Sequence, residues 1–449
     1  MINSVPSQTP LNLRAASPRM RIAALADADS VEFFPPAGPS PHIARYGMVP
    51  HDDDGIVVAR IRLGGSPMLV AAQDENFLAG SVGERHGAAL QSMLAQARRE
   101  PPAAIVLLLA SGGVRLHEAN AAELALSRAL AALLDARADG IPVVAVGVGN
   151  LFGGASVLAC AADRLALLPG TRIGLSGPKV LESVHGKWEL DADDDRDVEA
   201  VFGAKARSAM GFVDLLADDA DALRGWVYRT VRDRPDFATS VGATHALLRT
   251  RIAGDPAHTT PFATLACFDG AAPVDNGGRL WVRDECWLTR PHPGATVGPA
   301  DVHALDDALL EHVAPARPGA PNALLLVEDS AGHVVSRAAE MRFQSQFLAH
   351  HAAVLGLLRA QGRRLIGLLA GVGHSAAFFS NALQASTLYA LSGARVVAME
   401  PSAIVRITGL PAGALIDDDP LLGQPVRHLM AQGGVAAIVP DASIASLGL

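Results

Sequence analysis

The sequence predicts an α/β fold in which one structural plan occurs twice. Short, continuous apolar runs of strand length alternate with longer segments of helical periodicity, a pattern typical of parallel strands buried on both faces. Glycine pairs or other small residues stand where these strands lead into helices. Half of the 449 residues are hydrophobic but only 4% are aromatic, so the core has to pack small and aliphatic side chains. These observations predict two successive α/β domains.

The first half is predicted to begin with a β-hairpin and to continue with alternating strands and helices. A Gly-Gly turn separates two apolar segments, as in many hairpins. The amphipathic segment 120–137 is followed by Gly140 and Pro142, which are helix stop signals. We expect strands at 56–63, 67–73, 103–110, 143–148, 164–168 and 172–175, and helices at 87–98, 120–137 and 155–162.

The second half repeats this order of elements. In both halves the chain runs strand, small-residue junction, helix, strand, junction, helix, strand and strand, so an internal duplication is the simplest explanation. We expect strands at 323–327, 365–370, 395–399 and 403–407, a helix at 337–359, and a second helix from the GVGHSAA junction through Tyr389.

Composition indicates where the domains begin and end. Residues 253–278 are rich in Pro, Gly and Thr, which favours a boundary near residue 275. The first 30 residues contain Pro, Ser and Arg but no continuous apolar region, so a flexible tail is expected there and a secretory signal is not. We therefore predict a tail over 1–30 and domains over 31–275 and 276–449.

Charge, hydropathy and cysteine content exclude several classes of protein. The net charge of −9 and the pI near 5.9 argue against nucleic-acid binding. The sequence has no apolar run of the ~18 residues that indicate a membrane span. Cys160, Cys267 and Cys286 lie far apart, which favours neither a disulfide framework nor a zinc site. We expect a cytoplasmic protein with no membrane or nucleic-acid partner.

The glycine junctions are the strongest candidates for chemistry. Backbone N–H groups at a helix N-terminus point outward at the positive end of the helix dipole. Two such ends that converge on one oxygen can stabilise a developing oxyanion. A turn that needs no ligand explains any single glycine junction as well. The predicted donors are Gly112 and Gly113 with Gly153 and Gly154 in the first half, and Ala331 and Gly332 with Ser375 and Ala376 in the second.

Several of these stretches carry a resemblance to a known family. GIVVARIRLGGSPMLVAAQDENFLAGSVGERHGAA, LLLASGGVRLHEAN and GNLFGGASVLACAADRLALLPGTRIGLSGPKVLE together resemble the β subunit of biotin-independent malonate decarboxylase. From about residue 277 the chain resembles the γ subunit, through LLAGVGHSAAFFSNALQAS and ARVVAMEPSAIVRITG. The resemblance covers residues 45–230 and, more loosely, 277–449.

The resemblance implies two crotonase-like (ClpP/crotonase) spiral ββα domains of the carboxyltransferase type. It implies decarboxylation of a malonyl thioester on an acyl carrier protein, whose arm is phosphoribosyl-dephospho-CoA or phosphopantetheine. No metal and no permanently bound cofactor is expected. An acyl-carrier transferase subunit and further copies of the chain are the other expected partners. In this superfamily the oxyanion donors come from the loop matching 111–114 and the helix start matching 152–155.

Further residues are candidates for binding or proton transfer. His374 could protonate the carbanion, because its ordinary pKa lies near 6.5, or could simply bond to the backbone. Arg115 could bind a carboxylate or phosphate, or form a surface ion pair. Arg359, Arg363 and Arg364 could bind phosphates or form a solvated helix end. The remaining predicted substrate-binding residues are Ser111, Ser176, Gly177, Gly332, Gly371 and Gly373.

The chain also departs from the family pattern. Ala376 and Val372 stand where the γ pattern has Gly and Lys, Asn381 and Arg406 replace histidines, and Ala89 replaces a lysine. These changes leave the acyl chain and the proton donor open. Two alternatives remain: a carboxyltransferase that moves CO2 to or from biotin, and a scaffold that binds carrier protein without activity.

Overall fold

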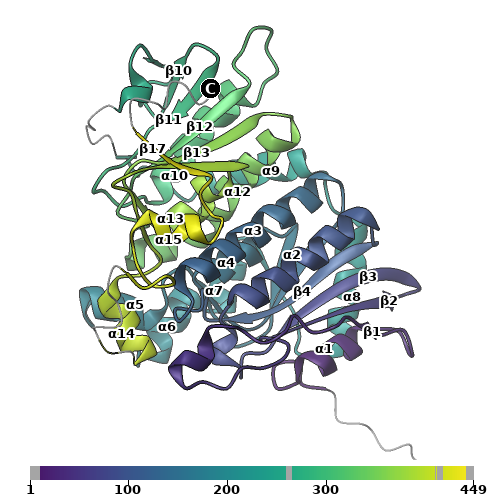
Figure 1. Ribbon diagram of the computed structural model, residues 1–449. Coiled ribbons are helices and arrows are strands. Elements are labelled where there is room, and N and C mark those ends of the chain that lie inside the picture. The colour runs from purple at the N-terminus through teal and green to yellow at the C-terminus, as the bar shows by residue number, and fades with distance from the viewer. Residues whose placement is uncertain (1–10, 259–264, 410, 412–417, 441–449) are drawn as a thin grey trace, which may run out of the picture.

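In the computed structural model, which describes residues 11–258, 265–409, 411 and 418–440, two large sheets enclose a central layer of helices (Figure 1). The first sheet has the order β1-β2-β3-β4-β5-β6-β8 with β7 beside β5, and the second has the order β17-β15-β13-β12-β11-β10-β9. The first-sheet strands are β1 (Glu32–Phe33), β2 (Ile56–Leu63), β3 (Ser66–Gln73), β4 (Ala104–Ser111), β5 (Val143–Phe152), β6 (Arg164–Leu167), β7 (Ile173–Gly174) and β8 (Val213–Leu215). The second-sheet strands are β9 (Ala272–Pro273), β10 (Leu280–Arg283), β11 (Cys286–Thr289), β12 (Ala323–Glu328), β13 (Arg364–Leu369), β15 (Thr387–Leu391) and β17 (Ala437–Val439).

The two sheets share one topology. An antiparallel hairpin, β2–β3 or β10–β11, leads into parallel strands, β4, β5, β6 and β8 or β12, β13, β15 and β17. In each half a short outer strand pairs in parallel with the end of β5 or with β14 (Val372–His374), the strand that follows β13. These outer pairs are β5 with β7, and β14 with β16 (Arg395–Val397). The predicted α/β fold with one plan repeated is confirmed. The boundary near residue 275 stays a prediction, and Ala272–Pro273 already pairs with β10.

Two long helices, α3 (Ala119–Ala138) and α12 (Gln344–Ala360), pack against each other between the sheets (Figure 1). A Cβ at Gly356 of α12 would lie 3.2 Å from the Cβ of Leu134 on α3, so this glycine permits a close approach. Beside this crossing, Arg359 donates to Asp135 through Nε (2.8 Å) and Nη2 (2.6 Å). Buried side chains of both helices and both sheets form one hydrophobic cluster. The two halves therefore share a core.

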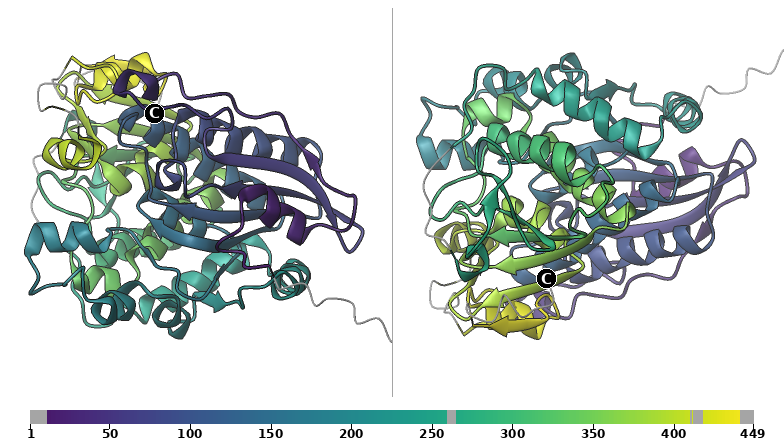
Figure 2. Two further views of the ribbon diagram at one scale, coloured as in Figure 1. Left: turned by 90° about the horizontal axis from the view of Figure 1, so that it is seen from below. Right: turned by 90° about the horizontal axis from the view of Figure 1, so that it is seen from above.

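Of the other helices, α2 (Glu84–Arg99), α4 (Gly154–Cys160), α9 (Phe237–Arg249) and α10 (Pro299–Ala308) pack beside α3 and α12 in the central layer, and α1 (Pro18–Leu25) and α8 (Ala220–Arg232) cover the outer face of the first sheet. Figure 2 shows the β2–β3 hairpin extending away from the second half. Among the described residues, no helix combines the length and the hydropathy needed to cross a membrane. The remaining helices are α5 (Pro178–His185), α6 (Asp195–Phe202), α7 (Ala204–Ala209), α11 (Arg337–Met341), α13 (Ser375–Ser380), α14 (Pro401–Thr408) and α15 (Val426–Ala431).

Three predicted elements of the second half were wrong. The helix predicted over 337–359 is interrupted at Phe343, whose φ of +66° separates α11 from α12. The helix expected to reach Tyr389 ends at Ser380, and Tyr389 lies on β15. The strand predicted over 403–407 is part of helix α14, because an apolar run of this length does not distinguish strand from helix. Pro401, at the first helical position, favours this helix start.

Candidate active site

The two glycine junctions of the first half lie in contact. Gly113, which follows β4, has φ +103°, and Gly153, which precedes α4, has φ +59°. A Cβ at Gly113 would lie 3.1 Å from the Phe152 carbonyl oxygen and 3.3 Å from the Cα of Gly153. A side chain is therefore disfavoured at Gly113 both by its φ and by the neighbouring backbone. The structure brings the loop after β4 and the start of α4 side by side.

Most of the predicted donor amides already have partners inside the protein. These bonds hold the loop in its shape, and they also mean that the same N–H groups cannot bind a substrate oxygen without breaking them. They run from Gly112 N to the Ala79 carbonyl (2.8 Å), from Gly113 N to Ser111 Oγ (3.1 Å) and from Gly153 N to the Leu175 carbonyl (3.0 Å).

The amides of Val114 and Gly154 have no hydrogen-bond partner within the described ranges. On either side of Val114, Val82 N donates to the Gly113 carbonyl (2.8 Å) and Arg115 N donates to the Val82 carbonyl (2.9 Å). Gly154 is the first residue of α4, and N–H groups in a first helical turn have no acceptor within the helix. Among the described residues of the first half, these two amides, each one residue beyond Gly113 or Gly153, are thus free to donate to an external oxygen.

The second half repeats the loop with other side chains. The bonds correspond one to one: Gly332 N to Ser330 Oγ (3.3 Å), Ala331 N to the Ala295 carbonyl (2.8 Å) and Val297 N to the Gly332 carbonyl (2.8 Å). Gly332 has φ +88° and takes the place of Gly113. Ser375 has φ +50°, an uncommon value for a residue with a Cβ, and takes the place of Gly153.

His374 covers the junction of the second half. A Cβ at Gly332 would lie only 3.0 Å from Cγ of His374. Burial lowers the pKa of His374, and it lowers the pKa of the nearby His333 to about 4. Both rings are therefore mostly neutral at neutral pH, where a neutral imidazole is a weak acid. This favours packing and backbone bonding for His374 over its predicted role as proton donor.

Gly371 and Gly373 are explained by packing within the protein. A Cβ at Gly371 would lie 2.3 Å from the carboxyl carbon of Asp329, and one at Gly373 would lie 2.9 Å from Cγ of Phe378. Both contacts are with neighbouring side chains of the same half. The structure therefore gives these two glycines a steric role in the strand ends that flank His374.

Ser176 lies at the contact between the two halves. Its N–H donates to Glu340 of α11 at 2.7 Å, and the N–H of Leu175 donates to the same carboxylate at 3.1 Å. Ser176 Oγ lies 3.2 Å from His333 Nε2. Burial raises the pKa of Glu340 to about 7, and the Arg207 guanidinium opposes this. Because the Leu175 carbonyl accepts from Gly153, Glu340 fixes the segment that holds the first junction.

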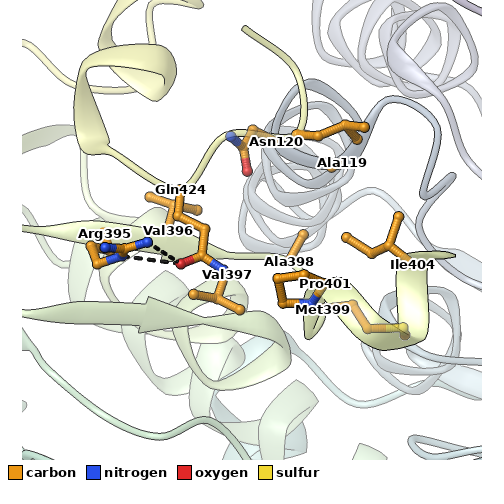
Figure 3. Close-up of a pocket in the computed structure, with 11 residues that line it drawn as sticks. Ala119, Asn120, Arg395, Val396, Val397, Ala398, Met399, Pro401, Ile404 and Gln424 are labelled. Carbon is orange, nitrogen blue, oxygen red and sulfur yellow. Dashed lines mark hydrogen bonds between the residues drawn. The ribbon is translucent and has the colours of Figure 1, made fainter. Parts of the chain in front are cut away.

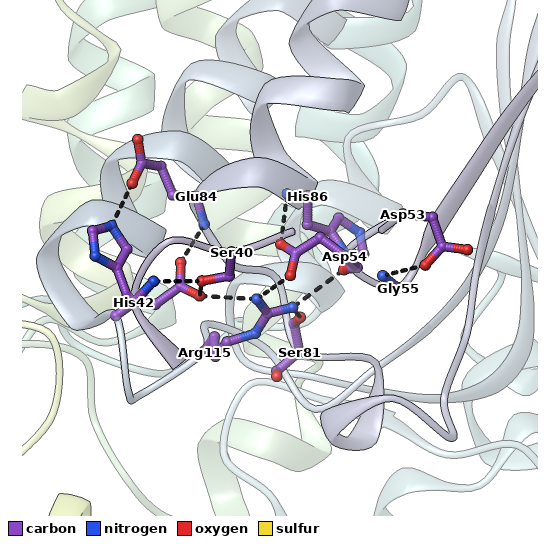
Figure 4. Close-up of polar contacts among 10 residues, drawn as sticks. Ser40, His42, Asp53, Asp54, Gly55, Ser81, Glu84, His86 and Arg115 are labelled. Carbon is purple, nitrogen blue, oxygen red and sulfur yellow. Dashed lines mark hydrogen bonds and ion pairs between the residues drawn. The ribbon is translucent and has the colours of Figure 1, made fainter. Parts of the chain in front are cut away.

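Arg115 is buried and bonded inside the protein, which disfavours its predicted role in binding substrate (Figure 4). Its side chain is 1% exposed, and Nη1 donates to Asp54 (2.6 Å) and Glu118 (2.9 Å). Nη2 donates to the Ser81 carbonyl (3.0 Å). Because Arg115 is buried, it does not form the surface ion pair that was the alternative prediction either. Its guanidinium ties the loop after Gly113 to the segments that precede β2 and α2.

Two buried carboxyl groups between the halves were not predicted. Glu123 on α3 and Glu328 at the end of β12 are each 3% exposed. Ser330 Oγ (2.9 Å) and Asn381 Nδ2 (2.7 Å) donate to Glu328, whereas Glu123 Oε2 has no partner in the described part of the chain. Burial raises the pKa of Glu123 to about 8 and that of Glu328 to about 7. Nothing in the sequence separates Glu123 from an exposed glutamate of an amphipathic helix.

A cavity of about 130 Å³ lies where the start of α3 meets β16 and α14 (Figure 3). Ala119 and Asn120 line it from the first half, and Val397, Ala398 and Ile404 line it from the second. Because β16 pairs with β14, this cavity lies beside the strand that carries His374. The predicted basic cluster is elsewhere and is engaged in the fold. Arg359 bonds to Asp135, and the Arg363 guanidinium donates to the carbonyls of Pro315 and Pro321.

Two repeats of a hairpin and parallel strands, each with a close-packed loop and helix start, define a crotonase-like protein of the carboxyltransferase type. Comparison with known proteins supports this class, because residues 16–239 match the carboxyl transferase domain. Residues 294–446 match the malonate decarboxylase gamma subunit. The first half is 32% identical over 233 residues to the malonyl-S-ACP:biotin-protein carboxyltransferase of Malonomonas rubra, a match that covers 47% of this chain and 71% of that protein.

Other relatives belong to the same superfamily. The acetyl-coenzyme A carboxylase carboxyl transferase subunit beta of a Synechococcus species is 26% identical over 232 residues, which cover 51% of this chain and 71% of that protein. A chain of a Pseudomonas malonate decarboxylase hetero-tetramer, solved in complex with malonate, is 36% identical with a TM-score of 0.48, and the match covers 50% of this chain and 85% of that chain. The chain belongs to the malonate decarboxylase family of carboxyltransferases, which confirms the resemblance and the crotonase-like fold.

Proposed function

We propose that this protein decarboxylates a malonyl or substituted malonyl thioester to the corresponding acetyl thioester. The observation that carries the proposal is that the amides of Val114 and Gly154, at two closely packed glycines, have no partner among the residues that the structure describes. Loss of CO2 from a malonyl thioester leaves an enolate, whose charge lies largely on the thioester oxygen. Preorganised donors aimed at such an oxygen are each worth about 2.7–4 kcal/mol of barrier.

Each residue of the first junction has a defined task in this mechanism. The N–H groups of Val114 and Gly154 bind the thioester oxygen, and Gly113 and Gly153 leave space for it. The C–C bond to the carboxylate breaks, its electron pair enters the enolate, CO2 leaves, and the α-carbon takes one proton that is supplied by water. Arg115 acts only through the loop that it holds in place.

We further propose that the acyl group arrives on an acyl carrier protein, at the end of a phosphopantetheine or phosphoribosyl-dephospho-CoA arm. The cavity at the start of α3 supports this, because Ala119 and Asn120 follow the loop of Val114 closely in the chain (Figure 3). Its walls are largely apolar side chains and β16 backbone, which suit a thin, flexible arm. An acyl-carrier transferase subunit and further copies of this chain complete the proposed set of partners. The proposed reaction uses no metal and no permanently bound cofactor.

A second candidate function is transfer of the carboxyl group to biotin on a partner protein. It is favoured by the Malonomonas rubra relative, whose name describes a malonyl-S-ACP:biotin-protein carboxyltransferase. The same oxyanion geometry would serve both reactions, since both pass through the enolate of the acyl thioester.

The mass of the carrier-bound acyl group distinguishes these functions. Purified protein is incubated with malonyl-loaded carrier protein, with acetyl-loaded carrier protein as the control, and the acyl mass is followed. Loss of the mass of CO2 without a biotinylated partner is the expected result. Loss only in the presence of a biotinylated acceptor would establish the transferase instead. Unchanged mass with retained binding would overturn both and leave a carrier-binding scaffold.

A further inference from the structure

Two histidines and an aspartate from two helices converge at a site away from the glycine junctions. His245 belongs to α9, and His303 and Asp307 belong to α10. His245 Nε2 lies 2.9 Å from Asp307 Oδ1, and His303 Nδ1 lies 3.2 Å from Asp307 Oδ2. One ligand atom from each residue lies within 4.8 Å of the other two. Both imidazoles are buried, while the Asp307 side chain is 41% exposed, so the cluster opens to solvent on one side.

The hydrogen bonds of His303 leave two acceptor atoms, His303 Nδ1 and Asp307 Oδ2, facing each other, and a bound cation would interact favourably with both. His303 Nε2 lies 3.2 Å from the carbonyl oxygen of His245, which can only accept, so Nε2 carries the proton. In a neutral imidazole the other nitrogen is then an acceptor. Nδ1 therefore directs a lone pair at Asp307 Oδ2, which is itself an acceptor.

His245 has the same arrangement at its second nitrogen. Its Nδ1 lies 3.1 Å from Nε2 of His350 on α12. His350 Nε2 can accept a hydrogen bond from His245 Nδ1–H, which leaves the lone pair of His245 Nε2 facing Asp307 Oδ1 at 2.9 Å, with Arg249 Nη2 3.5 Å from the same nitrogen. Metal-binding histidines characteristically donate the other ring N–H to an acceptor behind them. Both histidines here have such an acceptor, the His245 carbonyl and His350.

We propose that His245 Nε2, His303 Nδ1 and the Asp307 carboxylate bind one divalent transition-metal ion. Two imidazole nitrogens and a carboxylate are a common ligand set for Zn2+, with a water molecule as the fourth ligand. The ion links α9 to α10, and thereby joins the segment after the first sheet to the second half. The site is independent of the proposed decarboxylation and would operate in either candidate enzyme.

One further cation lies at this site. Arg249, on the last turn of α9, contacts Asp307 Oδ1 through Nη2. Its side chain is 64% exposed, so it can withdraw into solvent when an ion binds. Arg249 therefore competes with the metal for one carboxylate oxygen, and its removal should strengthen metal binding.

The test is Zn2+ stoichiometry and affinity of the full chain. The protein is treated with a chelator, titrated with Zn2+ by calorimetry, and analysed for bound zinc after gel filtration. We expect one equivalent per chain, loss of this equivalent in His303→Ala, and a 10–100-fold weaker affinity in His350→Gln. Arg249→Ala should bind at least as tightly as the wild type. Asp193→Asn, at the exposed member of the cluster of Glu182, Asp191 and Asp193, is the matched control and should change nothing.

Circular dichroism and the metal-free Tm establish that each variant folds. If His303→Ala does not fold, Asp307→Asn replaces it, because that carboxyl group is partly exposed. A wild-type protein that retains no zinc would overturn the proposal. Equal zinc binding by the wild type and by the folded ligand variant would overturn it as well.

Discussion

The carboxylate of Glu340 accepts the amide hydrogen of Ser176 at 2.7 Å, across the contact between the two halves of the chain. The neighbouring amide of Leu175 bonds to the same carboxylate, and the Leu175 carbonyl holds Gly153. The geometry of the first-half junction thus depends on a side chain that lies 187 positions later in the sequence than Gly153. This relationship makes the active-site geometry sensitive to how the halves pack.

Replacing Glu340 by Gln should weaken both stability and activity. At pH 8 the carboxyl group, whose pKa is raised to about 7, is mostly ionised, and its loss leaves the buried Arg207 without a counter-charge. Breaking a buried ion pair on one side destabilises by about 3–5 kcal/mol. Urea unfolding at pH 8 measures this cost. Glu100→Gln, at a side chain 64% exposed, should change stability by less than about 0.5 kcal/mol, and equal effects would contradict the role of Glu340.

Ser111→Ala and Ser330→Ala form a matched pair that separates the two junctions. Each serine Oγ accepts a hydrogen bond from one buried glycine amide, Gly113 or Gly332, so each substitution leaves that amide without its partner. Ser330 Oγ also donates to Glu328, so Ser330→Ala loses one bond more. Both variants should lose about 1–3 kcal/mol of stability. Only Ser111→Ala should lower kcat strongly, because it disturbs the proposed oxyanion loop. A larger fall of kcat in Ser330→Ala would place the chemistry in the second half.

Val114→Pro removes an amide hydrogen that has no hydrogen-bond partner within the described residues. Because no such bond is lost, its effect on stability should be smaller than its effect on turnover. If Val114 N–H binds the enolate oxygen, kcat should fall by about 10²–10³-fold. Val114→Ala keeps the amide and should retain most of the activity. A folded Val114→Pro variant with normal kcat would remove Val114 from the oxyanion site.

The buried carboxyl group of Glu123 should make stability fall as pH rises. Its pKa is raised from 4.5 to about 8, so between these values the folded protein holds a proton that the unfolded chain releases. The free energy of unfolding therefore decreases from about pH 4.5 to about pH 8. At 1.36 kcal/mol per pKa unit, the full contribution is at most about 5 kcal/mol.

Glu123→Leu should flatten this profile and exceed the wild type in stability most clearly at pH 8. Chemical unfolding at half-unit pH steps measures the profile. Glu123→Gln is the matched control, because it keeps the shape and polarity of the side chain but cannot titrate. Parallel slopes in the wild type and both variants would show that Glu123 does not titrate in this range.

The sequence predicts most first-sheet strands and the small-residue junctions, because apolar runs and glycines at strand ends are local features. In the second half it misses β10, β11, β15 and β17 and assigns part of α14 to a strand. The donor amides were harder to predict from the sequence. The amide of Gly113 donates to Ser111 Oγ and the amide of Gly112 donates to the carbonyl of Ala79, and these hydrogen bonds form only in the folded chain. Within the described part of the chain, the amide of Val114 is left without a partner, which no pattern of residue types reveals.

Charged residues were the other limit of sequence-based prediction. Arg115 follows a glycine loop, as a substrate-binding arginine often does, but its partners Asp54 and Glu118 form a buried cluster with it. Asp54 lies 61 positions away in the sequence, so the pairing has no local signal. Arg359 likewise finds its partner on the helix of the other half. Long-range pairing, rather than local composition, decided the role of each arginine.

The shared core around α3 and α12 means that the two halves depend on each other for their stability. Separate halves would each expose to solvent the apolar helical face that the other half buries in the intact chain. Because both halves belong to one polypeptide, they are present at a ratio of one to one, and their association does not depend on protein concentration. Heating should accordingly melt both halves in a single cooperative step.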